Sequence, residues 1–488
     1  MKDRETLTGF LGDHGAKRPI SFHMPGHKGR PEVFRYYGQD FVDRLVQGDI
    51  TEIPGADALQ QPDGIIKDLM DAYARHYHAR HTELLVNGSS AGIMAAVMTS
   101  VPRGGSLIMG RASHKSAYSA LRLGGIRPVY VESLFDEEYF LQGDIAPEAI
   151  KKAADEHPEA SAVFITSPNY YGVLSDIGKI AEIAHDAGMI LIVDQAHGAH
   201  LVDVDMRQRE MERKDPGGYR EAPAEFRSAE LLGADITINS IHKSLFGFTG
   251  TGVLNVCTDR PDVDRISRML GMLQTTSPSY ILMESLDASL QIMEKHGPYI
   301  IDRWRDDLDT FYEEAEEIAG LTVVTKDRRT YDRTKINLSF ADKGVRGSQL
   351  WEDLIYRNIW PEMVHGDYVL LLTGAGNRSE DYIQLLKALR EISDDYGIVA
   401  DPGEREKPFS GKMEQREVPA EAELIPIYQA EGRVLYDPII PYPPGVPLAC
   451  PGEVLSYEAI SYIGGLLGKG DQLMGVDEEG LIKVGKDV

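Results

Sequence analysis

The segment Met189-Ile190-Leu191-Ile192-Val193-Asp194 consists of five apolar residues and a terminal carboxylate. An apolar run of this length is typical of a strand covered on both faces, as strands of a parallel sheet are. Ligands of such sheets bind beyond the carboxyl ends of the strands. We therefore expect Asp194 to face a ligand, and other chemistry to lie in residues that follow strands.

Short apolar segments alternate with helical patterns on both sides of this strand. The other expected strands are 82–86, 106–109, 128–131, 162–166 and 235–239. Apolar residues recur at helical spacing in 91–101, 115–123, 147–155 and 176–187. This alternation predicts an α/β domain with a mostly parallel sheet.

Changes of pattern divide the chain further. We expect four parts: an N-terminal arm over 1–50, a large domain over 51–290, a small α/β domain over 291–400 and a C-terminal domain over 401–488. The best candidate linker is the segment 401–408. Helical spacing predicts separate helices over 281–295 and 298–319. The highly charged segment 203–227 is expected to be a surface excursion.

The 488 residues include 51 basic and 77 acidic side chains, a formal charge of −26. Nucleic acids and acidic membranes require clustered Lys and Arg, so this balance argues against both as partners. Solubility explains the charge, and attraction of a cationic small molecule is the alternative. The two cysteines, Cys257 and Cys450, exclude a disulfide framework and a Cys-rich zinc module. The chain shows neither a signal-peptide pattern nor a membrane-spanning apolar run, so a cytoplasmic protein is expected.

The segment Asn87-Gly88-Ser89-Ser90 lies between an expected strand and an expected helix. Glycine allows close approach of a ligand, and a helix N-terminus supplies free N–H groups and positive potential. The segment therefore suits a phosphate group, although Ser89 or Ser90 acting only as a helix cap explains the same pattern. The ATP-type loop Gly-x-x-x-x-Gly-Lys-[Ser/Thr] is absent.

Asp194 and Lys243 follow two further strands. Three roles fit Asp194: holding a proton on a heteroaromatic nitrogen, binding a metal with His197 or His200, or closing a turn. Lys243 is either a solvated surface charge or a partly desolvated amine that forms a Schiff base. A phosphate anchor, a carboxylate and an amine at strand ends are together what pyridoxal phosphate requires. The Gly-x-Gly-x-x-Gly motif of a dinucleotide-binding domain is absent after the first strand.

Residues 20–290 closely resemble the Orn/Lys/Arg decarboxylases, pyridoxal-phosphate enzymes of fold type I with the aspartate-aminotransferase architecture. The resemblance rests on ordered motifs, which are Phe22-His23-Met24-Pro25-Gly26-His27-Lys28, Asp49-Ile50-Thr51-Glu52-Ile53-Pro54-Gly55, Asn87-Gly88-Ser89-Ser90, His114-Lys115-Ser116, Thr166-Ser167-Pro168-Asn169-Tyr170-Tyr171-Gly172, Asp194-Gln195-Ala196-His197-Gly198-Ala199-His200, Ser240-Ile241-His242-Lys243 and Thr275-Thr276-Ser277-Pro278-Ser279-Tyr280. C-terminal matches are Tyr442-Pro443-Pro444-Gly445-Val446-Pro447 and Pro451-Gly452-Glu453. We expect a short form without the receiver-like N-terminal domain of larger members.

The resemblance implies a role for each matched residue at the cofactor. Lys243 is expected to form the Schiff base, Asp194 to pair with the pyridinium nitrogen, and Ala196 to lie against one ring face. The expected phosphate ligands are Ser89, Ser90 and Ser240, with Thr276 or Ser277 reaching in from a second subunit.

Three histidines complete the expected site. His114 is expected to stack on the other ring face, with a surface histidine at a helix start as the alternative. His242 is expected to contact the phosphate or the substrate carboxylate and to relay protons. His197 either contacts the cofactor or makes a structural hydrogen bond.

The implied activity is decarboxylation of arginine, lysine or ornithine to agmatine or a diamine plus CO2, as in polyamine biosynthesis, by a homodimer or larger homo-oligomer. Short members most often act on arginine, which favours that substrate. Recognition of the cationic side chain requires a carboxylate, and Glu52, Asp57 and Asp437 are the candidates.

Departures from the family pattern keep two alternatives open. Gln195 replaces the usual glutamate and Gln60 the usual histidine, while Asp437 stands where glutamate is common. These changes motivate other chemistry at Cα, such as oxidation or transamination. A catalytically decayed regulator is the second alternative, against which the intact Lys243 and Asp194 count.

Overall fold

The computed structural model describes residues 16–17, 19–36, 45, 47–214, 227–325, 327, 330–397, 413–441, 446–468 and 473–486. The candidate linker 401–408 and the segment 442–445 of the C-terminal motif lie outside the described residues.

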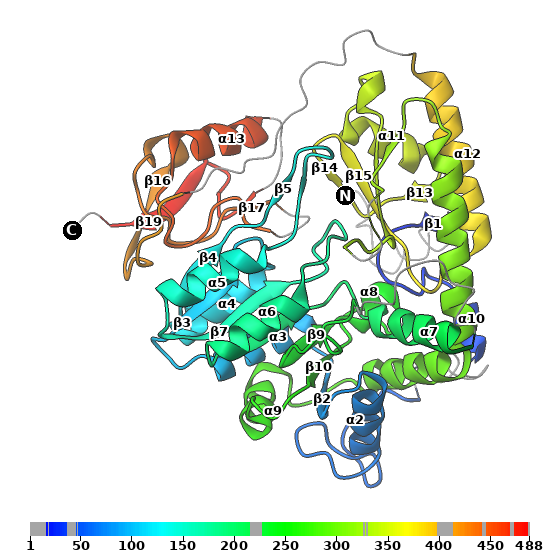
Figure 1. Ribbon diagram of the computed structural model, residues 1–488, viewed down its shortest axis with the longest axis horizontal. Helices are drawn as coiled ribbons and strands as arrows, with labels where there is room; N and C mark the ends of the chain where they lie inside the picture. Colours follow the sequence, from blue (N-terminus) through cyan, green and yellow to red (C-terminus); the bar gives the residue numbers. More distant parts are fainter. Residues whose placement is uncertain are drawn as a thin grey trace, which may run out of the picture.

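A seven-stranded sheet forms the centre of the molecule, in the order β2-β10-β9-β8-β7-β3-β4 (Figure 1). Its strands are β2 (His81–Leu85), β3 (Ser106–Gly110), β4 (Arg127–Val131), β7 (Ala160–Thr166), β8 (Ile190–Asp194), β9 (Ile236–Asn239) and β10 (Gly252–Val256). All neighbours pair in parallel except β10, which is antiparallel to both β2 and β9. The predicted mostly parallel sheet is confirmed, and β10 is the strand that the sequence pattern missed.

Helices cover both faces of this sheet, as the apolar run at 189–193 predicts. Ile192 lies in the core shared with α3 (Gly88–Ser100), α4 (Lys115–Gly124) and α9 (Val263–Leu273). Leu191 and Val193 point the other way, into the core shared with α5 (Pro147–Glu156) and α6 (Ile177–Asp186). Alternate residues of one strand are therefore buried on opposite faces, which explains why no polar residue interrupts it.

The smaller α/β unit contains an antiparallel sheet in the order β11-β12-β15-β14. Its elements are β11 (Thr322–Val323), β12 (Lys335–Ser339), η2 (Ala341–Lys343), α11 (Gly347–Tyr356), β13 (Ile359–Trp360), β14 (Met363–His365), β15 (Tyr368–Leu372) and α12 (Ser379–Asp395). Helix α10 (Tyr280–Glu316) connects it to the large sheet.

Helix α10 corrects the prediction of two separate helices. It continues through Gly297-Pro298, although proline lacks the N–H that would bond to the carbonyl four residues earlier. Ile300, Ile301 and Trp304, one turn later, are all buried in the main core. Their packing outweighs the lost hydrogen bond, which is a tertiary effect that local propensity does not show.

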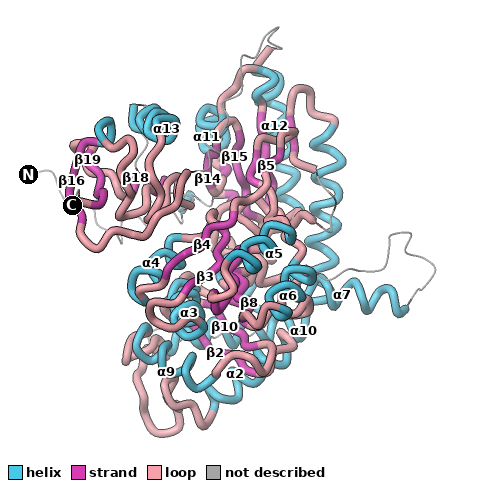
Figure 2. Tube along the Cα trace, turned by 60° about the vertical axis from the view of Figure 1, so that its left-hand side comes forward, coloured by secondary structure: helices cyan, strands magenta, loops and turns pink. Residues whose placement is uncertain are grey.

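The charged segment 203–227 is also partly helical. Helix α7 (Leu201–Lys214) covers its first half, and residues 215–226 lie outside the described residues. Arg207 forms an ion pair with Asp302 of α10, and Asp205 accepts backbone hydrogen bonds from Arg227 and Ser228. Figure 2 shows α7 running outward beyond α10. The described half is therefore an anchored helix rather than an irregular loop.

The N-terminal arm joins the two units. Strand β1 (Ile20–Ser21) pairs in parallel with β13, and η1 (Pro31–Tyr36) and α2 (Ile65–His76) follow it. Gly26 lies so close to the short helix α8 (Ile241–Ser244) that a Cβ on it would be 2.3 Å from the Leu245 carbonyl oxygen. Only glycine allows this approach.

The C-terminal unit has its own core and lies beside β4 and β5 in Figure 1. Its elements are β16 (Ala422–Pro426), η3 (Ile427–Gln429), β17 (Ile440–Pro441), α13 (Tyr457–Gly468), β18 (Leu473–Met474) and β19 (Leu481–Gly485). The neighbouring strands β5 (Phe135–Asp136) and β6 (Leu141–Gln142) belong to the large unit, where they form a hairpin. Glu453 receives two hydrogen bonds from Arg111, which follows β3, and this buried pair joins the unit to the large sheet. No described helix is both long and apolar enough to cross a membrane.

Candidate active site

The three polar features meet at one edge of the large sheet. Strands β2, β8 and β9 run in the same direction, so the residues that follow their carboxyl ends share that edge. These residues are Asn87-Gly88-Ser89-Ser90, Asp194 and Ser240-Ile241-His242-Lys243. The topology thus places the expected anchor, carboxylate and amine at the sheet edge where ligands of parallel sheets bind in a crevice.

The serine cluster lies at the start of α3. Ser240 Oγ donates to Ser89 Oγ at 2.8 Å, which links the ends of β9 and β2. Asn87 occupies the N-cap position and makes no side-chain cap bond; its amide donates instead to the Leu273 carbonyl. Ser89 and Ser90 are therefore first-turn residues rather than caps. With free N–H groups at the helix start and a φ of +77° at Gly88, the cluster fits a phosphate.

Asp194 ends β8 and is 2% exposed. Its Oδ1 accepts one hydrogen bond, from the Ala196 N–H at 3.1 Å. Burial raises the pKa of this carboxyl, and the charge of Lys243 acts in the opposite direction. Among the described residues no salt bridge joins Asp194 to a base, so a protonated ring nitrogen would supply the missing positive partner.

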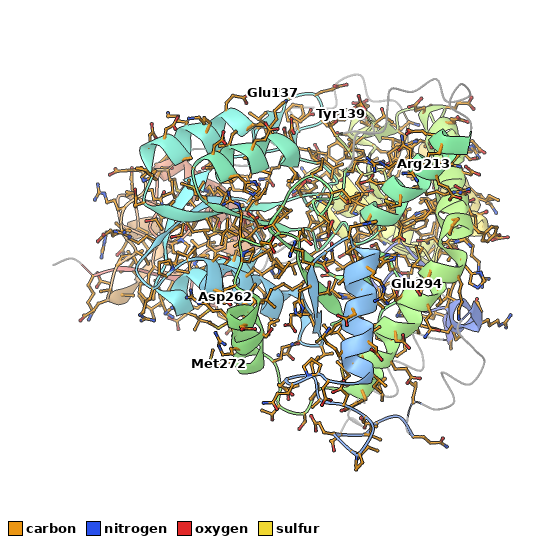
Figure 3. All side chains as sticks on the ribbon, turned by 60° about the horizontal axis from the view of Figure 1, so that its bottom comes forward. Glu137, Tyr139, Arg213, Asp262, Met272 and Glu294 are labelled. Carbon is orange, nitrogen blue, oxygen red and sulfur yellow. The ribbon has the colours of Figure 1, made fainter. Side chains whose placement is uncertain are left out.

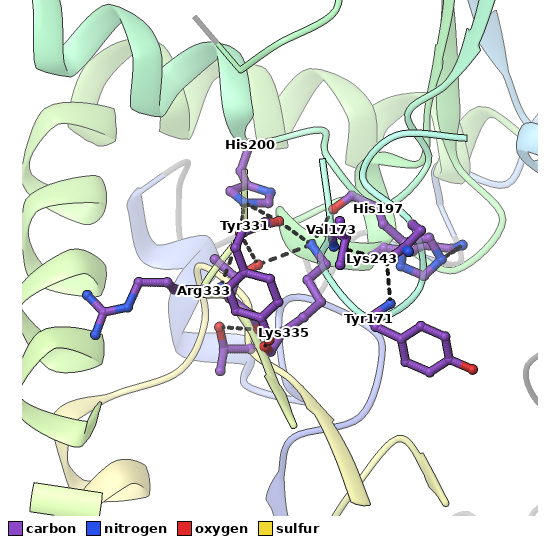
Figure 4. Close-up of polar contacts among 12 residues, drawn as sticks. Tyr171, Val173, His197, His200, Lys243, Tyr331, Arg333 and Lys335 are labelled. Atoms are coloured by element: carbon purple, nitrogen blue, oxygen red, sulfur yellow. Dashed lines mark hydrogen bonds and ion pairs between the residues drawn. The ribbon is translucent and has the colours of Figure 1, made fainter. Parts of the chain in front are cut away.

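Lys243 lies on α8 with its Nζ 2.9 Å from His197 Nε2 (Figure 4). Burial lowers the pKa of Lys243 to about 8, while Asp194 opposes the shift. Burial also lowers the pKa of His197 well below its usual value. A neutral His197 therefore accepts from the Lys243 ammonium through Nε2 and carries its own proton on Nδ1.

His114 and His242 are likewise neutral near pH 7. Burial and the charge of Lys243 lower the pKa of His114 to about 3, and its Nδ1 lies 2.8 Å from Ser116 Oγ at the start of α4. Burial lowers the pKa of His242 to about 4. His242 Nδ1 donates to the Thr251 carbonyl at 2.8 Å, which leaves Nε2 as a proton acceptor.

Thr276 and Ser277 are exposed in the single chain. They follow Gln274, whose Oε1 accepts the Val86 N–H at 2.8 Å beside the serine cluster. Gln60 donates to the Thr275 carbonyl at 2.8 Å, so its amide has a main-chain partner in this loop. The expected contact of Thr276 or Ser277 with the phosphate of a second subunit stays a prediction.

Gln195 points away from the crevice into the core. Its amide nitrogen donates to both carboxylate oxygens of buried Glu230, at 3.0 and 2.8 Å, and its oxygen accepts the Ala229 N–H at 2.7 Å. The departure therefore does not remove a charge beside the cofactor position. A glutamate at 195 would instead place two carboxylates in buried contact.

The three acids considered for substrate recognition lie elsewhere or are already engaged. Asp57 accepts backbone N–H groups around the start of α2, including those of Gly64 and Ile66. Asp437 forms ion pairs with Arg122 and Lys483. Glu52 is exposed.

Glu362 is an acid that the sequence patterns missed. It is 5% exposed and accepts hydrogen bonds from Tyr170 Oη and the Met24 N–H, each at 3.0 Å. The Tyr170 ring packs against His197 with centroids 4.5 Å apart. The negative charge of Glu362 also acts on Lys243, raising the pKa of that amine. No local motif marks Glu362, because its contacts join segments far apart in the chain.

Comparison with known proteins identifies the family of the chain. The family model for the Orn/Lys/Arg decarboxylase major domain matches residues 6–319, and that for the C-terminal domain of the family matches 408–479. The chain belongs to the Orn/Lys/Arg decarboxylase family. It is 30% identical to arginine decarboxylase of Bacillus subtilis over 477 residues, covering 95% of this chain and 94% of that one. Lysine decarboxylase LdcA of Pseudomonas aeruginosa is 25% identical in a match that covers 59% of this chain and 39% of LdcA.

Solved decarboxylases share the fold. The constitutive lysine decarboxylase of E. coli matches with a TM-score of 0.72 at 19% identity, covering 98% of this chain and 81% of that one. The lysine decarboxylase LdcF of Francisella novicida matches with a TM-score of 0.76 at 17% identity, covering 99% and 84%. The expected fold type I architecture is confirmed, and the chain is a decarboxylase of this family.

The contact between Gln195 and Glu230 predicts a compensated exchange. Gln195→Glu is expected to destabilise the protein by about 3 kcal/mol, because it brings two buried carboxylates together. Adding Glu230→Gln restores one amide and one carboxylate and is expected to recover most of the loss. Urea unfolding midpoints measure both effects; a double variant no more stable than Gln195→Glu alone contradicts the assignment.

The environment of Lys243 predicts a pH dependence. Only the neutral amine attacks an aldehyde, so incorporation of added pyridoxal phosphate into cofactor-free protein should rise with pH, with a midpoint near the Lys243 pKa of about 8. Asp194→Asn removes a charge that favours the ammonium, so its midpoint should fall below that of wild type. Absorbance of the bound cofactor measures this, with Lys243→Ala as the blank. An unchanged or higher midpoint in Asp194→Asn contradicts the prediction.

Proposed function

We propose that this chain decarboxylates arginine to agmatine and CO2 with pyridoxal phosphate bound at Lys243. The observation that carries the proposal is the Lys243 amine beside neutral His197, at the sheet edge that also holds Asp194 and the serine cluster. Relatives named arginine decarboxylase, 30% identical over 95% and 93% of this chain, support arginine over lysine and ornithine.

The residues fit the cofactor group by group. Ser89, Ser90 and Ser240 are proposed to hold its phosphate, and Asp194 to hold the proton of its ring nitrogen. Ala196, 4% exposed and bonded to Asp194, is proposed to support one ring face, with His114 on the other. When bound, pyridoxal phosphate supplies an aromatic system that accepts the electron pair of the broken bond between Cα and the carboxylate.

The chain's own groups then handle protons and exclude water. With cofactor and substrate bound to each other, Lys243 Nζ would be a free amine in the crevice, and burial lowers its pKa to about 8. The protonated form of this amine is proposed to deliver the proton to Cα that replaces CO2, with neutral His242 as a proton acceptor beside it. The buried histidines stay neutral, so they do not compete with the cationic substrate for negative charge.

Glu362 is the proposed carboxylate for the cationic end of the substrate. It is buried, it interacts electrostatically with Lys243, and Tyr170 connects it to His197. A carboxylate accepts through about four lone-pair directions. Hydrogen bonds from Tyr170 and Met24, with His23 Nε2 3.6 Å from Oε2, therefore leave acceptor capacity for a guanidinium.

A homodimer or larger assembly in the cytoplasm, acting in polyamine biosynthesis, completes the proposal. Exposed apolar side chains near the Thr276 segment support subunit contact: Ile53 is 51%, Ile65 60% and Met272 70% exposed. Figure 3 shows Met272 at the outer end of α9. Hydrogen bonds from Gln60 to Thr275 and from Tyr280 to Asp57 connect the loops that carry these residues.

A substrate panel tests the function. Purified protein with pyridoxal phosphate is incubated with arginine, lysine or ornithine, and CO2, amine, keto acid and H2O2 are measured. Agmatine and CO2 in equal amounts, with arginine preferred, are expected. Peroxide or keto acid without amine would establish the alternative chemistry at Cα, and no turnover with a bound cofactor would favour a regulatory role.

Replacing Glu362 tests substrate recognition. Glu362→Gln keeps an oxygen for Tyr170 or Met24 but removes the charge, so KM for arginine should rise about 10–100-fold, as expected for loss of a charged hydrogen bond. The fall in kcat should be smaller. Asp437→Asn, at a surface ion pair, is the matched control and should leave KM unchanged. An unchanged KM in Glu362→Gln removes Glu362 from the substrate site.

A further inference from the structure

A lysine of the smaller unit reaches into the turn that carries His197. Lys335 begins β12, and its Nζ donates to the His197 carbonyl oxygen (Figure 4). The same ammonium donates to Asp332 Oδ2 at 2.6 Å and to Thr334 Oγ1 at 3.1 Å. Three N–H groups thus meet three acceptors, and the side chain is 3% exposed. All three N–H groups of the Lys335 ammonium are therefore engaged in hydrogen bonds.

Asp332 is held as firmly as Lys335. Its Oδ1 accepts from the Thr334 N–H at 3.1 Å, the Thr334 hydroxyl at 2.8 Å and His200 Nε2 at 3.3 Å. Burial opposes its ionisation, but Lys335 and His200 together lower the pKa of Asp332 well below its usual value. The pair is therefore a buried carboxylate with a buried ammonium.

The backbone around Asp332 is bound to the large unit as well. The Asp332 N–H donates to the Gly172 carbonyl at 2.7 Å. A Cβ at Gly172, where φ is +98°, would lie 2.8 Å from the Asp332 carbonyl oxygen. Asn337 on β12 donates to the Tyr171 carbonyl at 2.9 Å. The ion pair is thus fixed against the segment that also presents Tyr170 to His197.

We propose that Lys335 and Asp332 are positioning residues, whose ion pair holds the His197 main chain so that its imidazole meets the Lys243 amine. The inference rests on the proposed function, because it assigns Lys243 and His197 to the reacting site. The Lys335 charge lowers the pKa of Lys243, but the hydrogen bond that Lys335 donates toward the site goes to the His197 carbonyl. It acts through the His197 peptide, three residues after Asp194 on the same turn.

The energetics favour positioning over stability as the reason for this pair. A buried ion pair repays its desolvation only with excellent geometry, and apolar replacements are often as stable. Removing one partner is costly, whereas replacing both with well-packed uncharged side chains of similar volume often costs little. Stability and positioning can therefore be separated experimentally.

The test compares Lys335→Met, Asp332→Asn and the double variant with wild type. Lys343→Met is the control, because Lys343 is another buried lysine of this unit, bonded to Ser393 and the Tyr396 carbonyl. Each protein is loaded with pyridoxal phosphate. The measurements are Tm, kcat and KM for arginine, and the circular dichroism of the bound cofactor, which reports its orientation.

The double variant is expected to regain most of the Tm lost by the single variants, yet to keep a kcat about 100-fold below wild type, as a misplacement of about 1 Å produces. Its cofactor signal should stay altered and its KM should change little. Lys343→Met should lose Tm while keeping kcat and the cofactor signal. If a single variant does not fold, the kcat and cofactor signal of the double variant, compared with wild type, test the proposal.

Recovery of kcat and of the cofactor signal together with Tm would overturn the proposal, since the pair would then be structural only. If wild type binds the cofactor but forms no agmatine, the proposed function fails on its own. In that case the circular dichroism of the double variant still decides whether the pair positions the site.

Discussion

The crevice depends on lysine ammonium groups that are buried away from water. Lys28, Lys243 and Lys335 each have a pKa that burial lowers. Lys28 donates to the His23 and Leu372 carbonyls, at 2.9 and 2.8 Å, and Lys335 donates to the His197 carbonyl. Main-chain oxygens from distant segments therefore meet at lysine side chains. Lys243 differs, because it lies 2.9 Å from a side-chain imidazole nitrogen, that of His197, rather than being held by main-chain carbonyls alone.

The strand positions are predictable because burial on both faces of a sheet requires a run of apolar residues. A strand covered on both faces cannot contain polar residues, and 189–193 shows this directly. Turn and polar residues mark the ends of β2, β8 and β9, so the sequence alone is enough to predict Ser89, Asp194, Ser240 and Lys243 as site residues. Strand β10 was missed because Gly252 and Asn255 interrupt its apolar run; Asn255 is buried and accepts a hydrogen bond from Thr82 on β2.

The misjudged features depend on contacts between distant segments. Pro298 predicted a helix end, but the buried residues after it keep α10 continuous. Gln195 is a departure from the family pattern that motivates other chemistry at Cα, but its amide is bound to buried Glu230, 35 residues later in the chain. Glu362 and Lys335 looked like ordinary charges, and only the meeting of the two units shows where they point. Sequence patterns identified the polar groups at the strand ends of the large sheet. They missed Glu362 and Lys335, which the smaller unit supplies.

The pairing of β1 with β13 has a consequence for synthesis of the chain. Met24 and Glu362, which hydrogen-bond beside these strands, are 338 residues apart. At about 5–20 residues per second, the ribosome needs roughly 20–70 s to produce the second partner after the first. Throughout that interval β13 and β15 are not yet available for the Pro25-Gly26 turn to pack against. The crevice can close only late in translation, so nascent chains that stop before β13 will expose apolar surface to chaperones or to one another.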